Sequence, residues 1–130
     1  MKVAFTSSNG EMIDRHFGMT ESFSIWEVAP EEAHAVETVP VIKHEGDEED
    51  KIAARVSLLK ECAIVYTMQI GGPAAAKLVA TRIQPMKTNA EVPIAEIVAK
   101  LQDVLRGNPP PWLRKAMHRG KPLAFLEEEE

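Results

Sequence analysis

Cysteine, aromatic residues and long hydrophobic runs are all scarce in this sequence of 130 residues. The one cysteine, Cys62, excludes a disulfide within the chain and is typical of a reducing compartment. No apolar run approaches the roughly 20 residues of a membrane-spanning helix, and the apolar start at residues 1–5 is too short for a secretion signal. We therefore expect a cytoplasmic protein that makes no use of a membrane.

Positive charge is also limited, because 15 Lys and Arg residues stand against 20 Asp and Glu residues, for a net charge of -5. Four of the acids close the sequence at residues 127–130, so the remainder is only mildly acidic. Neither a basic stripe nor basic residues interleaved with aromatics occur, which argues against a nucleic-acid partner. No catalytic constellation appears either, since Ser7 and Ser8 lack an identified base, and we expect a protein that is not an enzyme.

The sequence does contain the material for one folded domain. Hydrophobic residues make up 45% and charged residues 27%, as in globular proteins. An even division would leave two pieces that are each close to the lower limit for an independent core. We predict a domain at residues 1–106, followed at 107–130 by a proline-rich turn, a short helix and an acidic tail. No heptad seam stands out, and we expect a monomer.

Hydrophobic periodicity predicts the order of the elements. Alternation predicts strands at residues 2–6, 22–28 and 33–42, of which the second and third form an antiparallel pair. Helical spacing then begins at the acids at 47–50, and later helices begin at 71–73 and at 93. Short strands are predicted at 63–67 and 83–87, and a last short helix at 112–118. The order β-β-β-α-β-α-β-α predicts a three-layer α/β domain, because the later strands need helical crossovers and so run parallel.

Ligands of such open sheets collect at the carboxyl ends of the strands. The loops at 7–18, 68–72 and 88–92 qualify. His16 is the only histidine in these loops, and a lone histidine is more often structural than functional. Its neighbours favour a binding role, because Arg15 offers a fixed cation and Gly18 allows a positive φ or a close approach of the backbone.

Gly71 and Gly72 stand at a predicted helix start, where exposed N–H groups and the helix dipole attract an anion. A tight turn explains the same pair equally well. If the loops at 7–18 and 68–72 lie together, His16 faces this helix start. The phosphate-loop pattern Gly-x-x-x-x-Gly-Lys-Ser/Thr and the dinucleotide pattern Gly-x-Gly-x-x-Gly are both missing, which disfavours nucleotide binding.

Soft donor atoms for a metal cluster are few. Cys62 lies between a predicted helix and a strand, where cysteine is more often a small buried residue than a ligand. A cysteine-built iron–sulfur site normally needs four thiolates, so this chain does not supply one alone. A preformed cluster needs only one or two donors, for which the candidates are His16, Cys62, Met19 and Met68.

Four stretches together carry a resemblance to a known family. They read MKVAFTSSNGEMIDRHFG with the following FSIWEV, DEEDKIAARVSLLKECAIVYTMQIGGPAAAKLV, IQPMK and PIAEIVAKLQDVLRGNPPPWLRKAM, and they span residues 1 to about 117. The sequence resembles the NifX, NafY and NifB C-terminal family of nitrogenase iron–molybdenum cofactor carrier proteins. The element NPPPWLRKA is most similar to the NifX branch.

The resemblance implies a ribonuclease H-like fold with a five-stranded mixed sheet and no nuclease activity. It also implies an iron–sulfur cluster precursor of the iron–molybdenum cofactor as transient cargo, with NifB and the NifEN scaffold complex as partners. The family's cofactor-binding histidine, in a His-Phe-Gly motif, falls on His16, and its Ile-Gly-Gly loop falls on Ile70, Gly71 and Gly72. Arg15 replaces a glutamine of many relatives, and Met68 lies close to a position where some relatives carry a second cysteine.

The combined hypothesis is a non-enzymatic carrier of an anionic iron–sulfur precursor. Its predicted cofactor-binding residues are Arg15, His16, Gly18, Met68, Gly71 and Gly72. The predicted metal donors are His16 and Cys62. The alternative is a regulatory interaction protein that docks to the cofactor scaffold, with Trp112 and the rest of residues 107–130 as its most important part.

Overall fold

A computed structural model describes residues 1–43 and 45–118, and the acidic tail predicted at the end of the sequence lies outside the described residues. A five-stranded mixed sheet forms its centre, in the order β4-β3-β1-β5-β6. The β1–β3 and β3–β4 pairs are antiparallel, and the β1–β5 and β5–β6 pairs are parallel. The strands are β1 (Lys2–Thr6), β3 (Ser22–Val28), β4 (Ala33–Pro40), β5 (Cys62–Thr67) and β6 (Gln84–Lys87).

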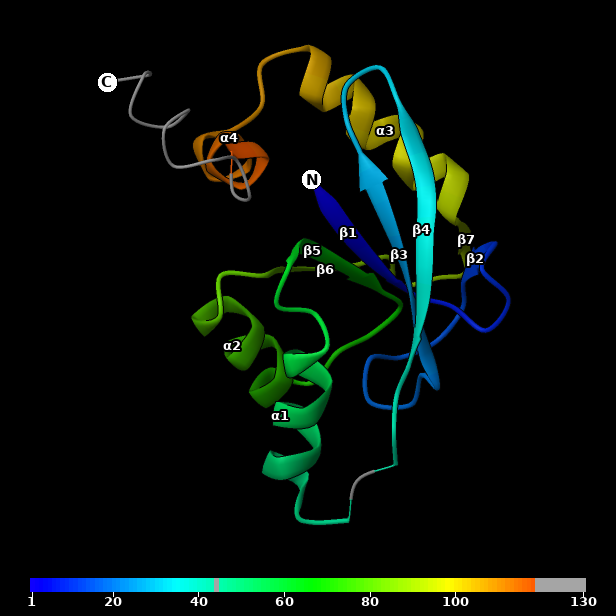
Figure 1. The fold of residues 1–130 in the computed structure, drawn as a ribbon, viewed down its shortest axis with the longest axis vertical. Coiled ribbons are helices and arrows are strands. Elements are labelled where there is room, and N and C mark those ends of the chain that lie inside the picture. Colours follow the sequence, from blue (N-terminus) through cyan, green and yellow to red (C-terminus); the bar gives the residue numbers. More distant parts are fainter. Residues whose placement is uncertain (44, 119–130) are drawn as a thin grey trace.

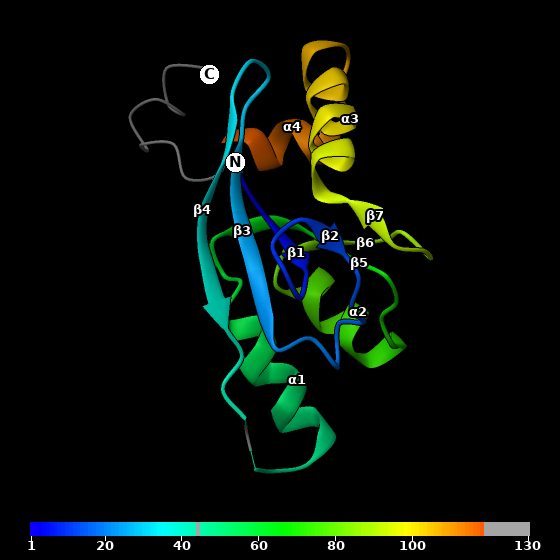
Figure 2. The same ribbon diagram turned by 90° about the vertical axis from the view of Figure 1, so that its right-hand side faces the viewer.

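Helices cover both faces of this sheet (Figures 1 and 2). They are α1 (Glu48–Ser57), α2 (Gly72–Ala80), α3 (Ile94–Arg106) and α4 (Pro111–His118). The core under α3 and α4 is separate from the core under α1 and α2. The predicted three-layer α/β fold with a five-stranded mixed sheet is therefore confirmed.

The predicted periodicities place the helices as expected. In α3, Ile94, Val98, Leu101 and Leu105 form one buried stripe against the sheet. The amino end of α1 is capped by Asp47, whose carboxylate accepts a hydrogen bond of 2.9 Å from the backbone N–H of Asp50. Within the described part of the chain, no helix has the length and apolar character of a membrane span.

Two details differ from the prediction. The strand predicted at 33–42 ends at Pro40, after which the chain turns toward α1. A second, two-stranded sheet pairs β2 (Met12–Ile13) with β7 (Val92–Pro93), and its strands of two residues are too short to show a hydrophobic period. This small sheet ties the loop after β1 to the segment that leads into α3.

Candidate functional site

The loop after β1 and the loop after β5 lie side by side, which meets the condition under which the sequence placed His16 opposite the Gly71–Gly72 helix start. The backbone N–H of Phe17 donates to the Gln69 carbonyl at 2.9 Å, and the N–H of Met68 donates to the Arg15 carbonyl at 3.1 Å. These bonds continue the contact between the two parallel strands beyond their carboxyl ends. The backbone on either side of His16 is therefore fixed to the β5 loop.

Two buried threonines strengthen this connection. Thr6 and Thr67 end β1 and β5, and both are fully buried. Thr6 Oγ1 donates to the Arg15 carbonyl at 2.7 Å, and Thr67 Oγ1 lies 3.1 Å from the same oxygen and 3.1 Å from Thr6 Oγ1. Because buried hydroxyls need partners, this cluster holds the residue before His16 in one place.

Arg55 of α1 holds the other side of the His16 turn. The His16 carbonyl accepts bonds of 3.0 Å from the N–H groups of Met19 and Thr20, which closes a tight turn. Arg55 Nη1 donates to the Phe17 carbonyl at 3.1 Å and to the Thr20 carbonyl at 2.8 Å. Partial burial lowers the pKa of Arg55, yet a guanidinium keeps its charge at neutral pH. The turn is thus bound to β5 on one side and to α1 on the other.

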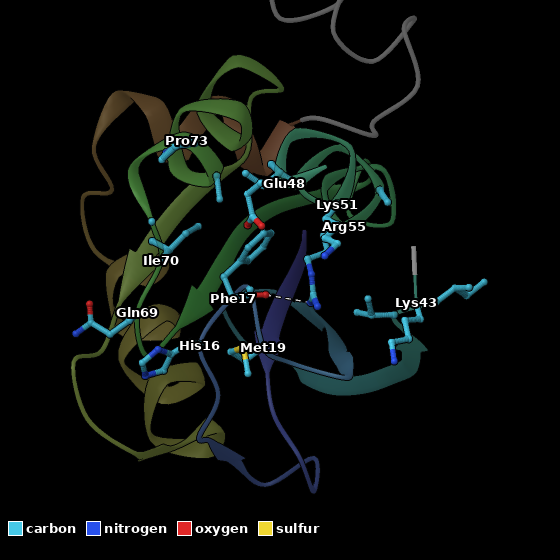
Figure 3. A pocket seen from close by; sticks show the side chains of 17 residues that line it. His16, Phe17, Met19, Lys43, Glu48, Lys51, Arg55, Gln69, Ile70 and Pro73 are labelled. Atoms are coloured by element: carbon cyan, nitrogen blue, oxygen red, sulfur yellow. Dashed lines mark hydrogen bonds between the residues drawn. The ribbon is translucent and has the colours of Figure 1, made fainter. Parts of the chain in front are cut away.

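A cavity of about 890 Å³ opens between these elements (Figure 3). Its wall consists of the turn at 16–19, the segment at 41–43, one face of α1 and the segment at 69–74. The volume is in the range of cavities that hold cofactors. His16 and Gln69 lie together at one side of the opening, and Lys43 lies at the other.

The described lining of the cavity carries more positive than negative charge. Lys43, Lys51 and Arg55 contribute cations, and Glu48 contributes the one carboxylate among the described lining residues. Gly71 forms the N-cap of α2 and no side chain caps this helix start. Because Pro73 has no N–H, the first-turn N–H groups beside the cavity wall are those of Gly72 and Ala74. This local charge is opposite to the net charge of -5 on the whole chain.

Three of the predicted site residues, His16, Gly18 and Gly71, line the cavity together. Gly72 is the first residue of α2, next to the wall. Gly18 does not take the positive φ that the sequence allowed, and an added Cβ there would meet no atom within 4 Å. Gly18 therefore leaves open space at the cavity rather than serving the turn.

The other predicted residues lie outside the described cavity lining. Arg15 is exposed beside it, with its backbone in the threonine cluster. Met68 is half-buried and packs against the core under α3 and α4. Cys62 is 3% exposed, begins β5 at the opposite end from His16, and belongs to the core under α1 and α2. The structure does not bring Cys62 and His16 together.

Sequence reasoning missed the cations that α1 supplies. Lys51 and Arg55 are four residues apart, so a helix places them on the same face, and this spacing could have been noticed. Nothing in the sequence indicates that Arg55 donates to carbonyls 35 and 38 residues away. Among the described residues, no group of three or more His, Cys, Asp or Glu side chains could hold a metal ion.

Comparison with known proteins shows to which family the chain belongs. Residues 1–104 match the family model described as dinitrogenase iron-molybdenum cofactor. The chain belongs to this family. Protein NifX of Herbaspirillum seropedicae is 43% identical over 133 residues, which cover 100% of this chain and 90% of that protein. Protein NifX of Azotobacter vinelandii is 41% identical over 120 residues, which cover 92% of this chain and 76% of that protein.

A solved structure supports the fold of this dinitrogenase cofactor family member independently. The crystal structure of PH0822 matches with a TM-score of 0.64 at 19% identity, covering 79% of this chain and 91% of that one. At this identity the match shows the fold alone. Together, the family model and the NifX relatives confirm the resemblance found in the sequence and give the chain a role in nitrogenase cofactor biosynthesis.

Proposed function

We propose that the chain is a non-enzymatic carrier that holds an anionic iron–sulfur precursor of the iron–molybdenum cofactor in the cavity beside His16. The observation that carries this proposal is the shared wall of one cavity. An exposed imidazole lies there with three cationic side chains and the amino end of α2, in a chain that is acidic overall.

Each part of the wall has a chemical task in this proposal. A neutral imidazole nitrogen of His16 is a suitable donor for an iron of a preformed cluster. Lys51, Arg55 and the N–H groups after Gly71 offset the negative charge of the cargo. A single protein donor suits a carrier, because the cargo must also be released.

The remaining predicted residues have indirect roles in this proposal. Arg15 adds positive charge beside the cavity, and Gly18 and Gly72 leave room for the cargo. Met68 and Cys62 pack in the two cores, and the proposal therefore does not assign them a bond to the cargo. By the resemblance, the cargo comes from NifB and is delivered to the NifEN scaffold complex.

Anaerobic mixing with the isolated precursor cluster, followed by desalting, tests the proposal. We expect the parent chain to keep iron–sulfur absorbance, and His16→Ala to lose most of it. His34→Ala is the matched control, because His34 is an exposed histidine on β4 that does not line the cavity. A parent chain that retains no absorbance would contradict the carrier function, and equal retention by His16→Ala would move the donor elsewhere.

A second candidate function is an interaction protein that regulates assembly by docking through α4. The observation that favours it is Trp112, which is 41% exposed beside a hollow of about 490 Å³ that Lys115 also lines. Trp112→Ala tests this function. Lost binding to the NifEN scaffold with unchanged cargo retention would support docking through α4, and unchanged binding would exclude it.

A further inference from the structure

The two most exposed large hydrophobic side chains of the described residues lie on one cavity. Ile42 is 78% exposed and Met19 is 74% exposed, and both line the cavity beside His16. The other exposed large hydrophobic residues of the described chain range from 36% to 58%. Single exposed apolar side chains are ordinary, but two such residues at one opening suggest a contact surface.

Two exposed cations belong to the same opening. Lys43 follows Ile42 directly, and Lys51 projects from α1 into the same cavity wall. We call Met19, Ile42, Lys43 and Lys51 the mouth surface. Its apolar and basic character on an acidic chain is complementary to a partner surface that combines carboxylates with apolar side chains.

We propose that the mouth surface docks a partner protein whose own cluster site is rimmed by acidic and apolar residues. The inference rests on the proposed function, because it places the partner where the cargo leaves. All four residues of the mouth surface line the cavity, so a partner seated on them also faces the space that would hold the cargo. Docking there excludes water from the cluster during transfer.

The transfer itself is a ligand exchange. The bond between iron and the His16 nitrogen breaks as a donor atom of the partner forms its own bond to the same iron, and the oxidation state of the cluster does not change. A partner seated over the opening brings its donor atom within reach of the cluster. A partner seated on α4 would leave the opening in contact with water.

Binding of the cargo-free chain to cargo-free NifEN scaffold tests the docking surface without any cluster. Ile42→Asn should weaken binding about tenfold, as for a central apolar contact, and Lys43→Gln should reduce the salt dependence of binding. Val104→Asn is the matched control, because Val104 is 43% exposed on α3 at the opposite face of the sheet. Equal binding by Ile42→Asn and the parent, or loss of binding in Trp112→Ala instead, would overturn the inference.

Transfer from the loaded chain separates this inference from the proposed function. We expect Ile42→Asn to deliver its cargo to the scaffold at least about fivefold more slowly than the parent when the rate is expressed per retained cluster. Equal delivery rates per retained cluster would overturn the mouth surface alone. No retention by the parent, with docking still weakened by Ile42→Asn, would overturn the carrier function and leave the docking surface in place.

Discussion

The two faces of the sheet use their helices differently. On one face, α3 buries four side chains in 13 residues, and α4 extends the same core. On the other face, α1 buries only Val56 in ten residues, and part of its surface lines a cavity. Under α3 the first face is closed by packing, while the second face carries the cavity of about 890 Å³ beside the carboxyl ends of β1 and β5.

The difference separates the face with the more extensive helix packing from the face that carries the candidate site. The charged side chains Glu48, Lys51 and Arg55 of α1 line the cavity. Such a helix gains less from burial than α3 does, so its surroundings are held by directed hydrogen bonds instead. Arg55 is the clearest example, because it joins α1 to the His16 turn.

The largest expected effect concerns the closed face. Leu101→Ala removes a side chain that is 5% exposed in the core under α3, and should lower the free energy of unfolding by about 2–5 kcal/mol. Lys51→Ala on α1 should change it by no more than about 0.5 kcal/mol. Urea denaturation measures both. Similar losses for the two variants would contradict the division between the faces.

The connection across the open face is tested by Arg55→Met. Loss of the two bonds to the Phe17 and Thr20 carbonyls should lower the free energy of unfolding by about 1–2 kcal/mol, because Arg55 is only partly buried. Amide hydrogen exchange should quicken at Met19 and Thr20. Lys51→Met removes a cation from the same helix without those bonds, and exchange as fast as in Arg55→Met would refute the role of Arg55.

Alkaline pH tests the packing of the face that α3 and α4 cover, through the ionisation of Tyr66. Tyr66 stacks on Phe5 with ring centroids 5.6 Å apart, and burial raises the pKa of Tyr66 above its usual value of about 10. The stability it contributes is therefore full below about pH 10 and is lost as the pH rises through the folded-state pKa. Tyr66→Phe should lose less stability than the parent over that range.

Tyr66 is the only tyrosine in the chain, so phenolate absorbance follows its ionisation directly. A midpoint at or below about 10 in the folded protein would show that burial does not raise the pKa.

The smallest expected effect on stability is at Gly18. A methyl group there meets no atom within 4 Å, and Gly18→Ala should leave the free energy of unfolding within about 0.5 kcal/mol of the parent. The added methyl can collide only with bound cargo, so retention should fall while stability does not. Gly10→Ala is the contrasting variant, because Gly10 takes a φ of 78° and its replacement strains the backbone.

Most of the fold could be predicted because the hydrophobic periods of its helices and strands are visible in the sequence. The apolar stripe of α3 and the alternation in β3 each follow from one element. The crossover through α1 makes β5 parallel to β4, and β4 is parallel to β1 because both are antiparallel to β3. The sequence left open whether the loops with His16 and Gly71 meet, and the hydrogen bonds between these loops show that they do. The pair of β2 and β7 could not be predicted, because two residues carry no period.

The site was less predictable, because side-chain direction depends on contacts that are distant in sequence. Met68 is the first residue of the loop after β5, yet its side chain packs against the core under α3 and α4 and does not line the cavity. Cys62 is a soft donor by composition, but it lies in the core at the far end of β5. The role of Arg55 could not be predicted, because it depends on hydrogen bonds to carbonyls of the His16 turn that are distant in sequence.

The most direct test of the account is the iron–nitrogen contact itself. Pulsed electron paramagnetic resonance on the chain with ¹⁵N-labelled histidine, loaded with a paramagnetic form of the precursor cluster, reports a nitrogen bound to iron. The account predicts a histidine ¹⁵N coupling in the parent and in His34→Ala, and its loss in His16→Ala. A coupling that persists in His16→Ala, or none in a loaded parent chain, would contradict the assignment of His16 as the donor.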